Sequence, residues 1–168
     1  MKTKDYYNKI AKGYDELYGK EQLRKWNVAK KLIRFSKKDN VLDVGCGTGI
    51  ITQKIARYVN FVVGLDISEE MIKRARLADN ITYIVGDARH LPFEDKKFDK
   101  VVSFTVIQDI RNWDKVLKEM KRVSKGIVLL TVLKRNKKLS DIKRKLSKYF
   151  KIKKFVEEEK DYIFLLSK

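Results

Sequence analysis

The sequence has one cysteine, one histidine and one proline in 168 residues. The lone Cys46 excludes a disulfide within the chain, and with the single His90 it excludes a zinc site of cysteine and histidine ligands, so we expect no metal. No apolar run approaches the ~20 residues that span a bilayer, and the first residues are polar. We therefore expect a cytoplasmic protein without a transmembrane segment or signal peptide.

Acidic residues are few beside basic ones. The chain has 40 Lys and Arg against 22 Asp and Glu, a formal charge of +18. Residues 134–154 hold eleven basic residues and one acidic residue, and residues 20–38, which include Lys25, form a second basic stretch. Such an excess favours polyanions or an anionic membrane surface. From charge alone, RNA, a membrane surface and a merely solvated surface all remain open.

Hydrophobic residues make up 43% of the chain, which excludes disorder. Apolar runs alternate with amphipathic stretches, and this alternation is typical of an α/β fold. The expected strands are 41–45, 61–66, 81–87, 98–105 and 127–133, and the expected helices are 22–35, 50–58, 69–77, 113–123 and 139–150. Residues 152–158 and 162–166 predict an antiparallel hairpin. We expect one domain over 1–168, with a helical lead-in at 1–38 and a core at 39–168.

A glycine-rich turn follows the first strand. Gly45, Gly47 and Gly49 lead directly into a helix, where glycines let a ligand approach the backbone and helix N–H groups face a negative group. The spacing differs from the dinucleotide fingerprint, and no Gly-Lys-Ser/Thr of a P-loop follows. Cys46 lies inside the turn, so we expect it to have a backbone or packing role there.

Acidic residues end the second and third strands. Asp66 is placed where a carboxylate can accept hydrogen bonds from both hydroxyls of a ribose. Asp87 and Ala88 are placed where a carboxylate and the neighbouring backbone can contact an adenine. Ligands of open α/β sheets bind along this edge, so three successive strand ends point to one ligand. Ser68, followed by two glutamates, is interpreted as a helix N-cap.

Four segments carry a resemblance to a known family. They read VLDVGCGTG at 41–49, VVGLDIS at 62–68, GDARHLPF at 86–93 and FDKVVSFTVIQDI at 98–110. In these segments the chain resembles the class I S-adenosylmethionine-dependent methyltransferases, in the branch of the ubiquinone and menaquinone enzymes. The resemblance implies S-adenosyl-L-methionine as cofactor. It also implies a Rossmann-like three-layer sandwich with a seven-stranded, mostly parallel sheet of order 3-2-1-4-5-7-6, in which strand 7 is antiparallel.

The resemblance also assigns roles to residues of the cofactor site. Asp43, Gly45 and Gly47 would surround the methionine end, Asp66 would bind the ribose, and Asp87 and Ala88 would meet the adenine edge. Thr105 and Tyr14 would lie near the transferred methyl group. The full cofactor-binding set is Tyr14, Asp43, Gly45, Cys46, Gly47, Asp66, Ile67, Asp87, Ala88 and Thr105.

The segment after the fourth strand is expected to face the methyl acceptor. It lacks the Asp/Asn/Ser-Pro-Pro-aromatic motif of many amine methyltransferases. Methylation of a pyrimidine carbon-5 needs a cysteine, and Cys46 is committed to the turn. Asp109 is the candidate for polarising the nucleophile, with Gln108 and Thr105 beside it; a turn-capping role for Asp109 stays open.

No inserted cap follows the fifth strand, so the pocket is expected to be open to a macromolecule. Lys143, Arg144 and Lys148 would contact phosphates, while Tyr6 and Tyr7 would stack a base. The first hypothesis is methylation of ribosomal or transfer RNA at a base nitrogen or hydroxyl. Methylation of a small molecule or quinone, methylation of a protein, and a non-catalytic cofactor-binding subunit with a small protein partner remain alternatives.

Overall fold

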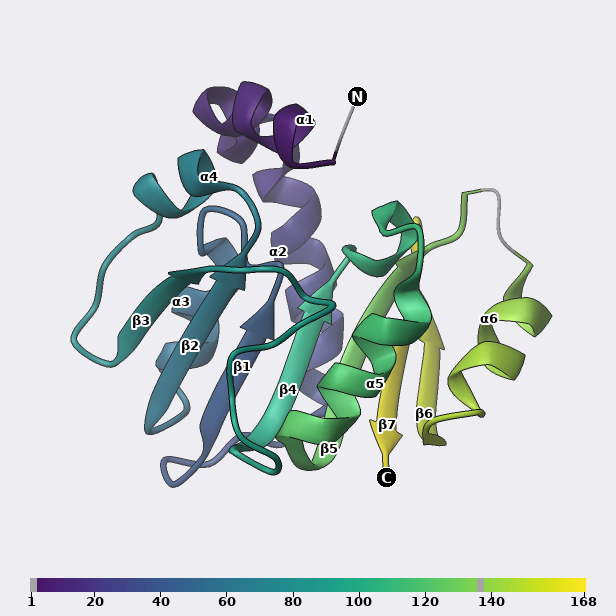
Figure 1. Ribbon diagram of the computed structural model, residues 1–168. Helices are drawn as coiled ribbons and strands as arrows, with labels where there is room; N and C mark the ends of the chain where they lie inside the picture. The colour runs from purple at the N-terminus through teal and green to yellow at the C-terminus, as the bar shows by residue number, and fades with distance from the viewer. Residues whose placement is uncertain (1–2, 136–137) are drawn as a thin grey trace.

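The structure is a computed structural model and describes residues 3–135 and 138–168. Its centre is a seven-stranded sheet of order β3-β2-β1-β4-β5-β7-β6 (Figure 1). The strands are β1 Asn40–Val44, β2 Phe61–Asp66, β3 Ile81–Val85, β4 Phe98–Phe104, β5 Ser124–Leu133, β6 Lys151–Glu157 and β7 Asp161–Ser167. β1 to β5 pair in parallel, and β7 is antiparallel to both β5 and β6. The predicted fold and the predicted strand order are therefore confirmed.

Helices cover both faces of the sheet, because its strands are apolar on both faces (Figure 1). The helical elements are α1 Thr3–Ile10, η1 Ala11–Gly13, α2 Tyr14–Leu32, α3 Ile50–Ala56, α4 Glu69–Lys73, η2 Ile107–Asp109, α5 Trp113–Val123 and α6 Leu139–Leu146. α2 and α3 pack on one face and α5 and α6 on the other.

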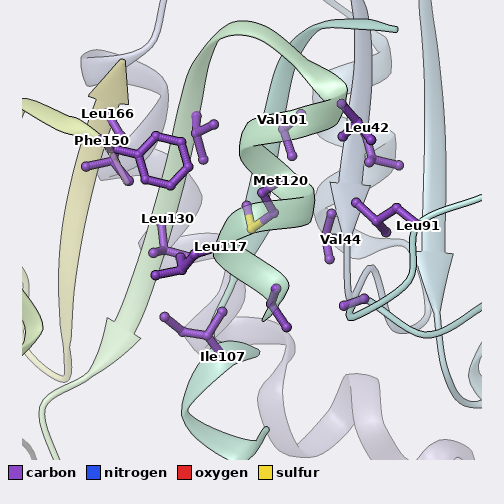
Figure 2. Close-up of a cluster of buried hydrophobic side chains, with 14 of the residues drawn as sticks. Leu42, Val44, Leu91, Val101, Ile107, Leu117, Met120, Leu130, Phe150 and Leu166 are labelled. Carbon is purple, nitrogen blue, oxygen red and sulfur yellow. The ribbon is translucent and has the colours of Figure 1, made fainter. Parts of the chain in front are cut away.

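Alternate residues of the strands other than β6 belong to the two halves of the core. On β1, Leu42 belongs to the cluster under α5 and α6, whereas its neighbour Val41 belongs to the cluster under α2 and α3. Figure 2 shows the first cluster, in which Met120 and Leu117 of α5 lie against strand residues. The sheet is thereby fixed between two apolar layers, and its carboxyl edge is held as a rigid platform.

Some helix bounds differ from those predicted. The helix predicted at 69–77 ends at Lys73, because the following residues offer no apolar side to the core and Leu77 is 85% exposed. The helix predicted at 139–150 ends at Leu146, where Tyr149 N donates to the Leu146 carbonyl and Phe150 turns into the core. Before β1, the helix predicted at 22–35 is the longer α2, which begins at Tyr14 and ends at Leu32.

Candidate functional site

A cavity of about 780 Å³ lies at the carboxyl edge of β1 to β4. α1 and α4 lie at this edge (Figure 1), and Tyr7 of α1 and Met71 of α4 line the cavity. Its volume is within the roughly 300–1,000 Å³ of small-molecule sites. Ten of the predicted site residues line it: Tyr7, Tyr14, Gly45, Gly47, Asp66, Ile67, Asp87, Ala88, Thr105 and Asp109.

The glycine turn after β1 forms one wall. Gly45, Gly47 and Gly49 have φ of 75°, 56° and 78°, a region that side chains with a Cβ rarely adopt. A Cβ on Gly45 would overlap the side chain of Val106, and one on Gly49 would overlap the Tyr83 hydroxyl. The turn therefore requires glycine for two reasons: its φ angles are positive, and neighbouring side chains lie where a Cβ would be.

Asp66 at the end of β2 faces the turn across the cavity floor. Its Oδ2 accepts from Gly47 N at 2.8 Å and its Oδ1 from Ser68 N at 2.9 Å. Burial raises the pKa of this carboxyl, while the two backbone N–H groups act in the opposite direction. Each oxygen has lone-pair capacity beyond its backbone bond, so the carboxylate can accept two further donors such as a pair of hydroxyls. Ser68 caps α4, as predicted, and its Oγ accepts from Met71 N.

Asp87 at the end of β3 is held by a neighbour that the sequence analysis did not single out. Arg89 Nε donates to Asp87 Oδ1 at 3.0 Å and Arg89 Nη2 donates to Oδ2 at 2.6 Å. The guanidinium lowers the pKa of the Asp87 carboxyl. The two side chains form a bidentate pair at the cavity wall, so Arg89 fixes the carboxylate there.

Asp43 and Cys46 do not line the large cavity. They line a separate cavity of about 20 Å³ behind the glycine turn. Asp43 is 1% exposed and its Oδ2 accepts from Thr52 Oγ1 at 2.7 Å. Burial raises the pKa of Asp43 to about 7, and burial likewise raises the pKa of the Cys46 thiol. Asp43 is therefore poised to change its charge near neutral pH.

Thr105 directly follows β4 and has a left-handed backbone conformation, with φ of 58°. Lys25 of α2 donates to its Oγ1 at 2.6 Å, and that oxygen donates to Asp161 Oδ1 at 3.1 Å. Lys25 also pairs with Asp161 Oδ2 at 3.0 Å and with Glu21 Oε1 at 2.8 Å. The hydroxyl of Thr105 is thus engaged by a buried ionic cluster.

This cluster corrects the interpretation of Lys25 as part of a basic surface. Lys25 and Asp161 are both 0% exposed. Their burial is tolerated because each charge has an opposite charge beside it. A non-glycine residue at positive φ costs of order 1–3 kcal/mol unless its surroundings hold it, and here the cluster holds Thr105.

Asp109, the predicted polarising residue, lies in η2 at the cavity wall. Tyr7 of α1 donates to its Oδ2 at 2.9 Å, so the N-terminal helix is tied to the far side of the cavity. Burial and the nearby carboxylate raise the pKa of the Tyr7 phenol. Tyr6 packs edge-on against Tyr7 and lies 3.4 Å from the Tyr18 hydroxyl, outside the cavity lining. The side chain of Gln108 lies outside the described part of the chain.

A second, shallower groove of about 590 Å³ lies between α5 and α6. Two predicted phosphate-contacting residues, Arg144 and Lys148, line it, together with Trp113, Asp114, Lys138, Asp141, Ile142 and Lys145. The third, Lys143, lies elsewhere, with its Nζ 4.3 Å from the centre of the Phe155 ring. Of the described residues, no group of three His, Cys, Asp or Glu is placed to hold a metal, and none of the described helices is long and apolar enough to cross a membrane.

Several cavity residues were missed by the sequence analysis. Arg89 lies within the motif segment 86–93, and Arg111 directly follows the segment 98–110. For both residues the only signal in the sequence was a position close to the end of a strand. Lys4 of α1 lines the cavity and pairs with Glu69 of α4. Gln22 lines the small cavity from α2, a helix whose weak amphipathic pattern does not indicate which polar side chains are buried.

Comparison with known proteins identifies similar chains. The family described as methyltransferase domain matches residues 42–130. An uncharacterised protein of Methanocaldococcus jannaschii, MJ1252, is 42% identical over 136 residues, covering 79% of this chain and 52% of that protein. A demethylmenaquinone methyltransferase of Listeria welshimeri is 35% identical over 137 residues, covering 74% of this chain and 58% of that enzyme. The chain thus spans about half the length of these curated relatives.

A solved structure shares the fold over almost the whole chain. It is a putative methyltransferase of Haloferax volcanii in complex with the Trm112 methyltransferase activator. The TM-score is 0.86, with 16% sequence identity and 96% coverage of both chains. At this identity the likeness concerns the fold.

Proposed function

The chain belongs to the methyltransferase domain family, with S-adenosylmethionine as cofactor, and from this premise we propose that it transfers the methyl group of S-adenosylmethionine to RNA. When bound, S-adenosylmethionine supplies a methyl group on a sulfonium sulfur, which leaves as a neutral thioether. The protein then has to bind the cofactor, align the acceptor and take up a proton where the acceptor carries one.

The residues of the large cavity suit this cofactor. Asp66 has spare acceptor capacity for the two ribose hydroxyls, and the apolar side chain of Ile67 follows it. The glycine turn leaves no Cβ between the cavity and the backbone. Asp87, fixed by Arg89, and Ala88 stand at the next strand end, where they would meet the adenine.

The acceptor side of the cavity is formed by the segment after β4. We assign Asp109 the role of orienting the nucleophile and accepting its proton, with Tyr7 as the residue that positions the carboxylate. Thr105, whose hydroxyl is held by Lys25 and Asp161, contributes to the shape of this wall. A positioned carboxylate within reach of a hydroxyl or amine is the usual arrangement for such proton transfer.

The observation that carries the RNA proposal is the groove between α5 and α6. Trp113 of the groove follows Arg111 of the cavity by two residues, a chain length of at most about 7 Å. A polyanion in the groove would therefore lie next to the cavity. Lys138 and Lys148 of the groove would contact phosphates without selecting sequence, together with Arg144 and Lys145, which also pair with Asp141 and Asp114. The chain's charge of +18 would add long-range attraction.

The test is incubation of the protein with labelled S-adenosylmethionine and RNA from a strain that lacks this gene, followed by mass spectrometry of nucleosides. A new methylated nucleoside is expected. The variant Arg144→Glu/Lys148→Glu should weaken RNA binding about tenfold or more at low salt and leave cofactor affinity unchanged. The matched control Lys38→Glu/Lys97→Glu reverses two exposed charges before β1 and β4, at the other edge of the sheet. Equal RNA binding by both variants would contradict the proposal.

A quinone-type acceptor is the second candidate. It is supported by the 35% identity to the demethylmenaquinone methyltransferase of Listeria welshimeri. The cavity also has apolar wall residues, among them Phe104, Val106 and Ile110, that suit an aromatic acceptor. Methylation of demethylmenaquinone with no transfer to RNA would select this function over the first.

A small protein partner is the remaining proposal. The Haloferax volcanii neighbour was solved with the Trm112 activator, and it covers the same length of chain. If this chain requires such a partner, the purified protein will bind S-adenosylhomocysteine but transfer no methyl group until lysate from its source is added. Full activity of the purified protein would exclude an obligatory partner.

A further inference from the structure

The basic residues that line the large cavity, among those described, are Lys4, Arg89 and Arg111. Two of them pair with carboxylates. Lys4 Nζ lies 2.8 Å from Glu69 Oε1, and Arg89 Nη2 lies 2.6 Å from Asp87 Oδ2. Arg111 is exposed, and its guanidinium forms no ion pair or hydrogen bond with the described residues. Of the described cavity residues, Arg111 is thus the basic one whose charge is not paired with an acid.

The acidic residues on either side of Arg111 in the sequence are engaged by other groups. Asp109 Oδ2 accepts from the Tyr7 hydroxyl at 2.9 Å. Asp114 Oδ2 lies 2.5 Å from Lys145 Nζ. Because both carboxylates already have a donor, the fold leaves the Arg111 guanidinium available to a ligand.

Arg111 stands between the acceptor wall of the cavity and the groove of α5 and α6. It follows Asp109, the proposed proton acceptor, by two residues, and it precedes Trp113, which lines the groove, by two residues. Each of these steps along the chain spans at most about 7 Å. A ligand that reaches from the groove into the cavity would therefore pass Arg111.

The chemistry of the guanidinium specifies the group that it would bind. Its planar fork of N–H donors matches two oxygens of a phosphate or a carboxylate. The groove beyond Arg111 has Lys138 and Lys148, which form no ion pair with the described residues. Several such charges in succession suit a chain of phosphates better than a single carboxylate, because each neutralised phosphate adds to the affinity.

We propose that Arg111 binds the phosphate of the nucleotide whose base or ribose enters the cavity. The residue thereby selects an acceptor with a phosphate, whereas an uncharged quinone gains nothing from it. The proposal rests on the proposed methylation of RNA and adds the residue that places the acceptor beside Asp109. The phosphate is remote from the transferred methyl group, so the contact stabilises the bound substrate and the transition state alike. Its removal therefore raises KM and leaves kcat unchanged.

The test measures methyl transfer at increasing concentrations of RNA from a strain that lacks this gene. Arg111→Gln keeps a polar side chain and removes both the charge and the fork. It should raise the KM for RNA about tenfold or more, as for a hydrogen bond to a charged group, with kcat within about twofold. Arg111→Lys keeps the charge without the fork and should raise KM by a smaller factor.

A second measurement needs no methyl transfer. Binding of a short fluorescent oligouridylate to the whole chain, with S-adenosylhomocysteine present, is followed by anisotropy over a range of salt concentrations. Arg111→Gln removes one phosphate contact, so the slope of log K against log salt should decrease in magnitude by about 0.7. The matched control Arg57→Gln removes an exposed guanidinium at the end of α3, before β2, and should leave both KM and the slope unchanged.

Three results would overturn the proposal. Equal KM and equal slopes for Arg111→Gln and Arg57→Gln would mean that only the overall charge matters. A lower affinity of Arg111→Gln for S-adenosylhomocysteine, measured by calorimetry, would mean that Arg111 binds the carboxylate of the cofactor. A lower kcat at unchanged KM would mean that Arg111 acts on the reacting group.

The two measurements also separate this proposal from the proposed function. If the wild type methylates RNA, any of these three results removes the role of Arg111 and leaves RNA as the acceptor. If the wild type binds RNA but transfers a methyl group only with a partner, the salt dependence decides on Arg111 by itself. If the wild type neither methylates nor binds RNA, the proposed function fails and the role of Arg111 fails with it.

Discussion

The substitution Lys25→Met tests whether the buried ionic cluster under Thr105 holds the fold together. Methionine fills much of the same volume but leaves Asp161, which is 0% exposed, without its cation. Removal of one partner of a buried pair costs about 3–5 kcal/mol. Glu21 retains Lys160 at 3.0 Å and is partly exposed, so it adds little to the loss.

The effect is measurable by thermal and urea denaturation. For a chain of this length, about 3–5 kcal/mol corresponds to a decrease in melting temperature of roughly 6–20 °C. The double variant Lys25→Met/Asp161→Asn removes both charges and should recover most of the stability, because a neutral buried pair avoids the unpaired charge. Lys30→Met, on the exposed side of the same helix, is the matched control and should change stability by less than about 0.5 kcal/mol.

The pH dependence of the free energy of unfolding provides a second test of the same variant. Burial raises the pKa of Asp161, and Lys25 acts in the opposite direction, so its removal raises that pKa further. A carboxyl whose folded pKa lies above its unfolded value contributes stability at low pH that is lost as the pH rises through the folded pKa. The deficit of Lys25→Met should therefore shrink on acidification. A variant within about 1 kcal/mol of the wild type, or a double variant no more stable than the single one, would refute this reasoning.

Two further predictions concern the glycine turn and the small cavity. Gly45→Ala places a Cβ at positive φ against Val106, so urea denaturation should show a loss of about 1–3 kcal/mol, whereas Gly126→Ala, with open space around it, should not. Because burial raises the pKa of Asp43 to about 7, affinity for S-adenosylhomocysteine should rise about tenfold from pH 6 to 8 as the carboxyl ionises. Calorimetry of Asp43→Asn should show no such rise.

The strands and the turn could be predicted because their signals are local, whereas the order of the strands in the sheet came from the resemblance to the family. Consecutive apolar residues in a strand indicate burial on both faces, and the glycines after β1 mark a backbone conformation that other residues avoid. Asp66 could be placed because the carboxyl ends of parallel strands meet at one edge. These features need only the order of residues along a short segment, so the sequence contains them.

The buried polar residues of α2 could not be predicted for the opposite reason. Lys25 is one of several lysines on the helix, and only contact with Asp161, 136 residues away by number, distinguishes it from an exposed one. The burial of Gln22 likewise depends on distant residues, because Asp43 of β1 and Gly45 of the following turn line the same small cavity. The burial of such groups depends on tertiary contacts, whereas helical periodicity reports only the apolar side.

Some supports of the site lie outside the segment that the family matches. The family match covers residues 42–130, which include the glycine turn, Asp66 and Thr105. Three supports lie outside it. Gln22 on α2 lines the small cavity, and Lys25 on α2 and Asp161 at the start of β7 hydrogen-bond to the Thr105 hydroxyl. The family match therefore contains most of the residues proposed to bind the cofactor, whereas Thr105 at the proposed acceptor wall is held by residues outside the match.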